Sequence, residues 1–154
     1  MKELDTSAIG RSEMDNRLAY LHVKLSEPGG LDLVVDAGLE LVLVGMGIPT
    51  ATTVYPPESI PAYTASLDEA RKFVALALPG FYVTSGLCAL TGHASLGPDY
   101  NGPDGERLRT EWPPEETPCC CDEDLAPGDG VHRECRAILA AAVRALAHRR
   151  KATP

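Results

Sequence analysis

The chain has 154 residues, of which 44% are hydrophobic and 5% aromatic, so it can form one domain with a core of mainly Leu, Val and Ala. Its formal net charge of −8 argues against duplex nucleic acid as a partner, because an acidic surface repels phosphate backbones. The longest apolar stretch, residues 39–49, is too short and interrupted to cross a bilayer, and residues 1–16 lack a secretory signal, so we expect a cytoplasmic protein that does not bind membranes.

The first part of the domain, residues 13–47, is predicted to be helical. Residues 1–12 before it are polar and aperiodic, so we expect a flexible N-terminus. A first helix follows from apolar residues at helical spacing, and the sequence Pro28-Gly29-Gly30 ends it. The apolar residues of this helix are Met14, Leu18, Leu21 and Leu25.

Residues 31–44 form a dense apolar segment that fits either a helix or a strand. Asp32, Asp36 and Glu40 recur at four-residue spacing, which places three carboxylates on one helix face and therefore favours the helix. Such a face can bind a cation, but a solvated helix surface explains it more simply.

The clearest local signal is the sequence YTASLDEARKFVALALPGF, which follows a Pro- and Thr-rich extended connection. Ser66 is predicted to cap a helix there, and Glu69 three residues later completes a capping box. The sequence Pro79-Gly80 ends this helix.

Three short strands are predicted after this helix. Residues 81–88 and 89–96 predict a hairpin, and residues 106–112 alternate in polarity as a third strand does. Residues 113–130, rich in proline, acids and cysteine, are expected to form a loop. A final helix begins near Gly130 and carries one apolar stripe that includes Cys135.

Three sequence features occur together within residues 60–148. They are a Tyr-Thr-x-Ser-Leu-Asp-x-Ala helix start, a Leu-Pro-Gly-aromatic helix end and an Ala/Leu-rich last helix built around a cysteine. The matching residues are Tyr63, Thr64, Ser66, Leu67, Asp68, Ala70, Leu78, Pro79, Gly80, Phe81, Cys135, Leu139, Arg144 and Ala145. Together they resemble the phage ABA sandwich domain, a small family of phage and prophage genomes.

This resemblance implies three layers, helix on sheet on helix, and a phage context, but no catalytic motif. We therefore expect a single α+β domain over residues 13–150. Its predicted architecture is an α/β/α sandwich with a small, mainly antiparallel, three-stranded sheet.

A ligand site is predicted on the third strand. Arg107 and Arg109 would share one face of this strand, and Trp112 lies just beyond them in the sequence. Arginines bind carboxylate or phosphate groups in bidentate fashion, and an indole can stack on a nucleobase. Tyr82 and Tyr100 are expected nearby, so the pattern predicts a small anionic or nucleotide-like ligand. The alternative is an exposed strand face paired with neighbouring glutamates, with Trp112 in the core.

The five cysteines are Cys88, Cys119, Cys120, Cys121 and Cys135. Their odd number predicts thiols and not disulfides. A zinc site built on Cys119 and Cys121 is an alternative, but adjacent cysteines rarely chelate together and there is no second pair at zinc-ligand spacing. We predict no metal and no cofactor.

These observations favour a non-enzymatic phage accessory protein that binds a host molecule in the host cell cytoplasm. One version sequesters a small nucleotide-like immune signal. Another is an acidic protein–protein interaction module that inhibits a host factor or mimics DNA, its partner being a host or phage protein. A homo-oligomer is expected, because a three-stranded sheet leaves edges to be paired or covered.

Overall fold

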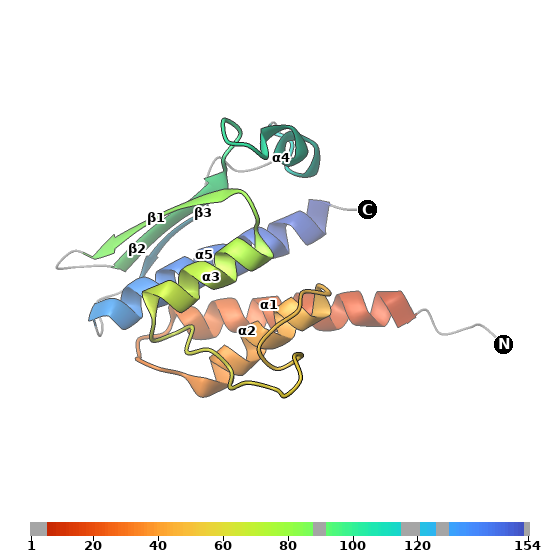
Figure 1. Ribbon diagram of the computed structural model, residues 1–154. Coiled ribbons are helices and arrows are strands. Elements are labelled where there is room, and N and C mark those ends of the chain that lie inside the picture. The colour runs from red at the N-terminus through yellow and green to blue at the C-terminus, as the bar shows by residue number, and fades with distance from the viewer. Residues whose placement is uncertain (1–5, 88–91, 115–120, 126–129, 153–154) are drawn as a thin grey trace.

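The computed structural model describes residues 6–87, 92–114, 121–125 and 130–152 (Figure 1). These residues form a mixed helical and strand domain, which confirms the α+β class. The helices are α1 (Thr6–Ser26), α2 (Leu33–Gly45), α3 (Leu67–Ala77), α4 (Gly105–Glu111) and α5 (Gly130–Ala152). The strands are β1 (Phe81–Leu87), β2 (Gly92–Pro98) and β3 (Cys121–Leu125).

The four longer helices agree with the sequence prediction in kind, although α1 starts earlier than expected. It begins at Thr6, so part of the segment predicted to be flexible is helical. In α2, the Asp32 side chain accepts hydrogen bonds from the backbone N–H groups of Val34 and Val35. In α3, Ser66 accepts one from the N–H of Glu69, which confirms the predicted cap, while the N–H of Ser66 donates to the carbonyl oxygen of Ala62 and not to Glu69.

The sheet has the strand order β1-β2-β3 with antiparallel pairing. The predicted hairpin is present, with Phe81 paired to Pro98 and Leu87 to Gly92. The segment Cys121–Leu125 pairs with β2, so part of the stretch predicted to be a loop is extended.

The prediction of a strand at residues 106–112 is wrong, because this segment is the helix α4. Leu108 and Trp112 are four residues apart and both buried, which puts them on one face of a helix. Thr110, which would share their face in a strand, is exposed. Seven residues of alternating polarity fit both periods, so the pattern alone could not separate them.

The layers follow the order sheet, then α3 and α5, then α1 and α2 (Figure 1). The predicted order of helix, sheet, helix is therefore wrong. The reason lies in α5, which is buried all round between Cys135 and Val143 because it packs on the sheet, on α3 and on α1. On the opposite face of the sheet, Tyr82, Thr84 and His93 are exposed.

Helices α1 and α2 approach each other closely at two glycines of α2. A Cβ atom at Gly38 would lie 2.8 Å from Cδ2 of Leu21, and one at Gly45 would lie 2.6 Å from Cε of Met14. Leu21 and Met14 belong to the predicted apolar face of α1, which is buried as expected. This contact fixes which side of α2 faces α1.

Candidate functional site

The predicted ligand residues Arg107 and Arg109 do not share a face. Two residues apart on a helix, they point roughly 200° away from each other. The Arg107 guanidinium donates to Oε2 of Glu111 at 2.8 Å and to the carbonyl oxygen of Pro79 at 3.0 Å, and lies 3.9 Å from Asp104. Arg107 thus holds α4 against the end of α3 and is occupied by groups of its own chain.

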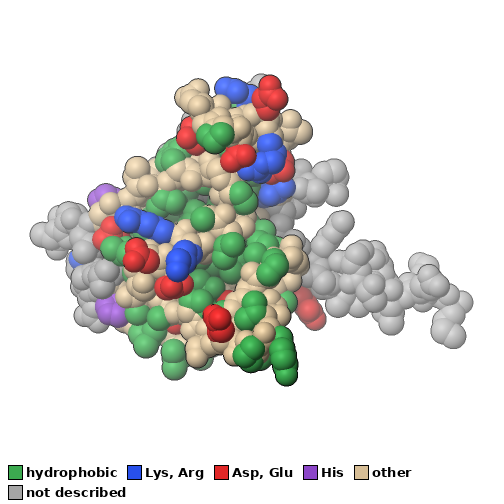
Figure 2. Space-filling model, in the orientation of Figure 1, with side chains coloured by type: hydrophobic (Ala, Val, Ile, Leu, Met, Phe, Trp, Pro, Cys, Tyr) green, Lys and Arg blue, Asp and Glu red, His purple; other side chains and the backbone are tan. Residues whose placement is uncertain are grey.

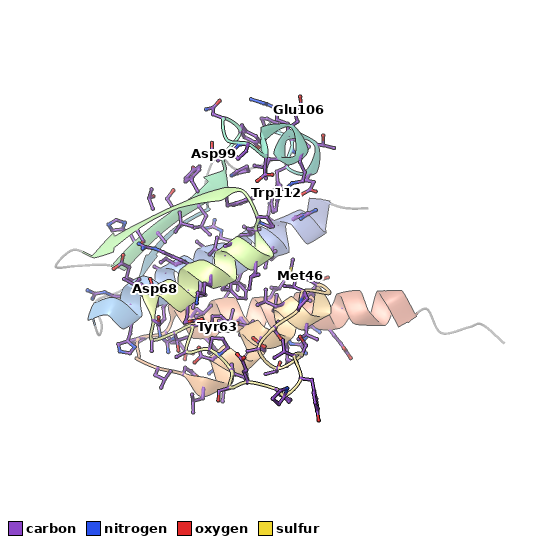
Figure 3. All side chains as sticks on the ribbon, in the orientation of Figure 1. Met46, Tyr63, Asp68, Asp99, Glu106 and Trp112 are labelled. Atoms are coloured by element: carbon purple, nitrogen blue, oxygen red, sulfur yellow. The ribbon has the colours of Figure 1, made fainter. Side chains whose placement is uncertain are left out.

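Trp112 belongs to the core, as the alternative interpretation predicted. Its side chain is 4% exposed and packs edge-on against Phe81, with ring centroids 4.9 Å apart. Its carbonyl oxygen accepts a hydrogen bond of 2.6 Å from the hydroxyl of Tyr100, and Arg109 lies over the Tyr100 ring at 5.5 Å. Figure 3 shows Trp112 pointing toward the body of the domain from the end of α4. A base could stack on this indole only if the core opened.

Tyr82, the fifth predicted residue, lies on β1 and is paired in register with Gly97. Its side chain is exposed on the sheet face that no helix covers among the described residues. Of the predicted site, the structure therefore brings together Arg109, Tyr100 and Trp112.

Among the five cysteines, Cys135 is the one whose side chain the structure describes, and it is a free thiol. Cys135 is fully buried in α5, and burial together with the nearby Glu134 carboxylate raises the pKa of its thiol to about 11. It packs as a small hydrophobic residue, as predicted. Cys88, Cys119 and Cys120 lie outside the described residues, and within those residues no cluster of His, Cys, Asp and Glu could hold a metal ion.

Glu40 of α2 is buried, although its helix face was predicted to be solvated. Its Oε2 accepts a hydrogen bond of 2.8 Å from the hydroxyl of Tyr63, and its Oε1 accepts one of 2.9 Å from the hydroxyl of Thr52. Burial acts to raise the pKa of Glu40, but the hydrogen bonds from Thr50, Tyr63 and Thr52 outweigh it and leave the pKa below its ordinary value. Glu40 therefore stays ionised and anchors the segment between α2 and α3.

Asp36, one turn earlier, is also buried and performs a similar role. Its Oδ1 accepts a hydrogen bond of 2.9 Å from the backbone N–H of Thr64, whose hydroxyl in turn accepts one from the N–H of Asp32. Burial raises the pKa of Asp36 above its ordinary value, with the Thr64 hydrogen bonds acting in the opposite direction. The Tyr-Thr pair of the predicted helix start thus links two acids of α2 to α3.

Because its acids point inward, α2 turns apolar side chains outward. Leu33 is 72% exposed and Val34 66%, and Leu41 and Val44 are exposed as well, with Ala37 partly exposed between them. We call these residues the α2 outer stripe: Leu33, Val34, Ala37, Leu41 and Val44. Figure 2 shows hydrophobic side chains along the lower edge of the molecule, where Figure 1 places α2.

Further exposed apolar side chains lie in the segments that flank α2 in the chain. Among the described residues, all the exposed large hydrophobic side chains except Leu76 and Tyr82 fall between Tyr20 and Ile60. Exposed apolar side chains at one place on a domain mark an interaction site. In the part of the chain that the structure describes, no helix is long and apolar enough to cross a membrane.

Comparison of the chain with protein-family models, with curated proteins and with solved structures found no match. The resemblance to the phage ABA sandwich domain therefore stays a prediction that depends on the sequence features described above.

Proposed function

We propose that this protein is a non-enzymatic binding module that docks a protein partner through the α2 outer stripe. The observation that carries the proposal is the orientation of α2, in which both charged residues face inward and the apolar outer stripe is left at the surface. Exposing Leu33 and Val34 to water is unfavourable, and a partner that covers them recovers about 25 cal/mol for each Å² removed from water.

The chemistry of the stripe favours a protein as the ligand. Its side chains are aliphatic and offer neither a hydrogen-bond donor nor a charge to a phosphate or a base. Val34, Ala37, Leu41 and Val44 follow one another at intervals of three, four and three residues. This is the spacing with which one helix packs against another, so a second helix with an apolar face fits the stripe.

The version in which Arg107, Arg109 and Trp112 bind a nucleotide-like signal has less support. Arg107 is paired within the chain and Trp112 is buried. Calorimetric titration with mono-, di- and cyclic nucleotides is expected to give no binding heat. A heat that disappears in an Arg109→Ala variant would restore the nucleotide version.

The resemblance adds a biological setting to the proposal. In that setting, the protein is a phage accessory protein that binds a host or phage protein in the host cytoplasm. The acidic surface then affects which partners approach it, and the apolar stripe makes the contact.

A photoreactive residue tests the docking site directly. We would place p-benzoylphenylalanine at position 41 in the stripe, and as a control at position 110, which is exposed on α4. Illumination is expected to crosslink a partner protein to position 41 and no protein to position 110. Equal labelling at both positions, or none at position 41, would contradict a docking site on α2.

A further inference from the structure

We infer that the partner of the α2 outer stripe is the same stripe on a second copy of the chain, so that two antiparallel α2 helices form a two-fold symmetric dimer. This inference rests on the proposed function and names its partner.

The stripe is complementary to itself in the antiparallel direction. A two-fold axis beside Leu39 sets residue 34 of one copy against residue 44 of the other, and residue 37 against residue 41. Each Leu41 then faces an Ala37, and each Val34 faces a Val44. A large side chain faces a small one at the centre of the contact, and side chains of equal size face each other at its ends. This arrangement lets two helices approach closely and interdigitate.

Such a match is what a two-fold interface requires, because every contact between two positions must occur twice. A parallel arrangement would set Leu41 against Leu41 and Ala37 against Ala37. The helices would then be held apart at one level and leave a gap at the next.

The charge of the chain does not oppose pairing with a second copy at the stripe. The formal net charge of −8 would select a basic partner if the docking surface were charged. However, both charged side chains within α2, Asp36 and Glu40, are buried and hydrogen-bonded inside the domain. Two acidic chains can therefore meet at the stripe without placing like charges opposite each other.

The stripe and the exposed apolar side chains of the segments that flank α2 in the chain supply apolar area for a dimer. Outside α2, these exposed large side chains are Tyr20 and Val23 on α1 and Val54, Tyr55 and Ile60 in the segment after α2. A standard interface buries about 800 Å² on each partner. The stripe supplies the centre of such an interface, and Leu31 and Met46 are exposed just beyond the two ends of α2.

Sedimentation of the full chain tests the inference. We expect a dimer at micromolar concentration. The Leu41→Glu variant is expected to raise the dimer dissociation constant by at least about 100-fold, since each dimer loses two central contacts. Val34→Glu is a second disrupting variant, and circular dichroism checks that both stay folded. Leu76→Glu, which changes a comparably exposed leucine of α3, is the matched control and should leave the dimer intact.

The register has its own test. Leu41→Glu and Ala37→Lys are each expected to be monomeric, but their mixture should form a heterodimer, because the two new charges face each other only in the antiparallel pairing. A mixture that stays monomeric would contradict this register.

The outcomes separate the two proposals. A chain that is monomeric at high micromolar concentration, or a dimer that Leu41→Glu does not weaken, would overturn the inference. If position 41 of such a monomer still crosslinks to a different protein, the proposed function stands and only the partner is wrong. If it crosslinks to nothing, both fail.

Discussion

The hydroxyl of Tyr63 donates a hydrogen bond of 2.8 Å to Oε2 of Glu40, and this contact joins α2 to the segment that leads into α3. Both side chains are buried, and Tyr63 packs edge-on against Phe73. The carboxylate therefore depends on partners within the protein, because water cannot replace them. The same burial and the adjoining Glu40 carboxylate raise the pKa of Tyr63 well above its ordinary value.

Removing the Tyr63 hydroxyl is therefore expected to destabilise the fold. Tyr63→Phe should lower the free energy of unfolding by about 1–3 kcal/mol, because it leaves a buried charged acceptor without one of its donors. Urea denaturation at neutral pH measures this change. Tyr20→Phe is the control, since Tyr20 is 48% exposed on α1, and it should change stability little. Equal effects of the two substitutions would contradict the role of the hydrogen bond.

Burial of two carboxylates with opposite pKa shifts predicts opposite pH dependences. Burial raises the pKa of Asp36 above its ordinary value of 3.8, so it contributes stability when protonated at low pH and loses that contribution as the pH rises through its folded pKa. Glu40 has a pKa lowered below 4.5, so its contribution is complete above that value and is lost as the pH falls through its folded pKa.

The variants Asp36→Asn and Glu40→Gln separate these effects. From about pH 4 to pH 7, the wild-type protein should lose stability relative to Asp36→Asn. As the pH falls from about 5 to 3, the wild-type protein should lose its greater stability relative to Glu40→Gln. Denaturation curves across this range give both differences. If both stability differences changed with pH in the same direction, one of the two carboxylates would not be in the environment described.

How far the sequence predicts this fold depends on how local each signal is. The cap at Ser66 and the apolar face of α1 are set by neighbouring residues, and both are confirmed. The strand β3 has the sequence CDEDL, which contains no β-branched or aromatic residue. Its extended form comes from pairing with β2, a long-range contact that local reasoning cannot supply.

The candidate site was missed for a similar reason. The sequence placed Asp36 and Glu40 on one helix face correctly, and it was natural to assign that face to solvent. Their burial depends on Thr64 and Tyr63, which are 28 and 23 residues away. Apart from its two acids and two glycines, α2 consists of apolar residues. When the acids face inward, some of the aliphatic side chains are therefore left at the surface.

Arg136 of α5 holds the connection between α1 and α2. Arg136 is 4% exposed, and its Nη1 and Nη2 donate to the carbonyl oxygens of Lys24 and Gly30, each at 2.9 Å. Nη1 also reaches the carbonyl oxygen of Glu27 at 3.4 Å. A planar guanidinium can serve carbonyls from both α1 and the following turn, whereas an ammonium group cannot reach them together.

Arg136→Lys is consequently expected to lower the free energy of unfolding by about 2–3 kcal/mol, since partly buried carbonyl oxygens lose charged donors. Arg71→Lys on α3, where the arginine is exposed, is the matched substitution and should have little effect. Chemical denaturation of both variants at pH 7 compares them. If the Arg136 variant were as stable as the Arg71 variant, the guanidinium would not hold this connection.

The two close-approach glycines of α2 predict opposite effects of the same substitution. Alanine is favoured over glycine within a helix by about 1 kcal/mol. At Gly38, however, the new methyl group would meet three atoms of Leu21 between 2.8 and 3.7 Å, and Leu21 is fully buried with no room to move. At Gly45 it would meet only the terminal methyl group of Met14, a flexible side chain at the edge of the core that can rotate away.

Gly38→Ala is therefore expected to destabilise the protein by about 1–3 kcal/mol through overpacking. Gly45→Ala should be neutral or stabilise it by up to about 1 kcal/mol. Urea denaturation distinguishes the two, and a stabilising Gly38→Ala would mean that α1 and α2 pack less closely than described. Because Gly38 lies beside Ala37, a shift of α2 away from α1 would also displace the outer stripe, so Gly38→Ala should alter the dimer dissociation constant and Gly45→Ala should alter it less.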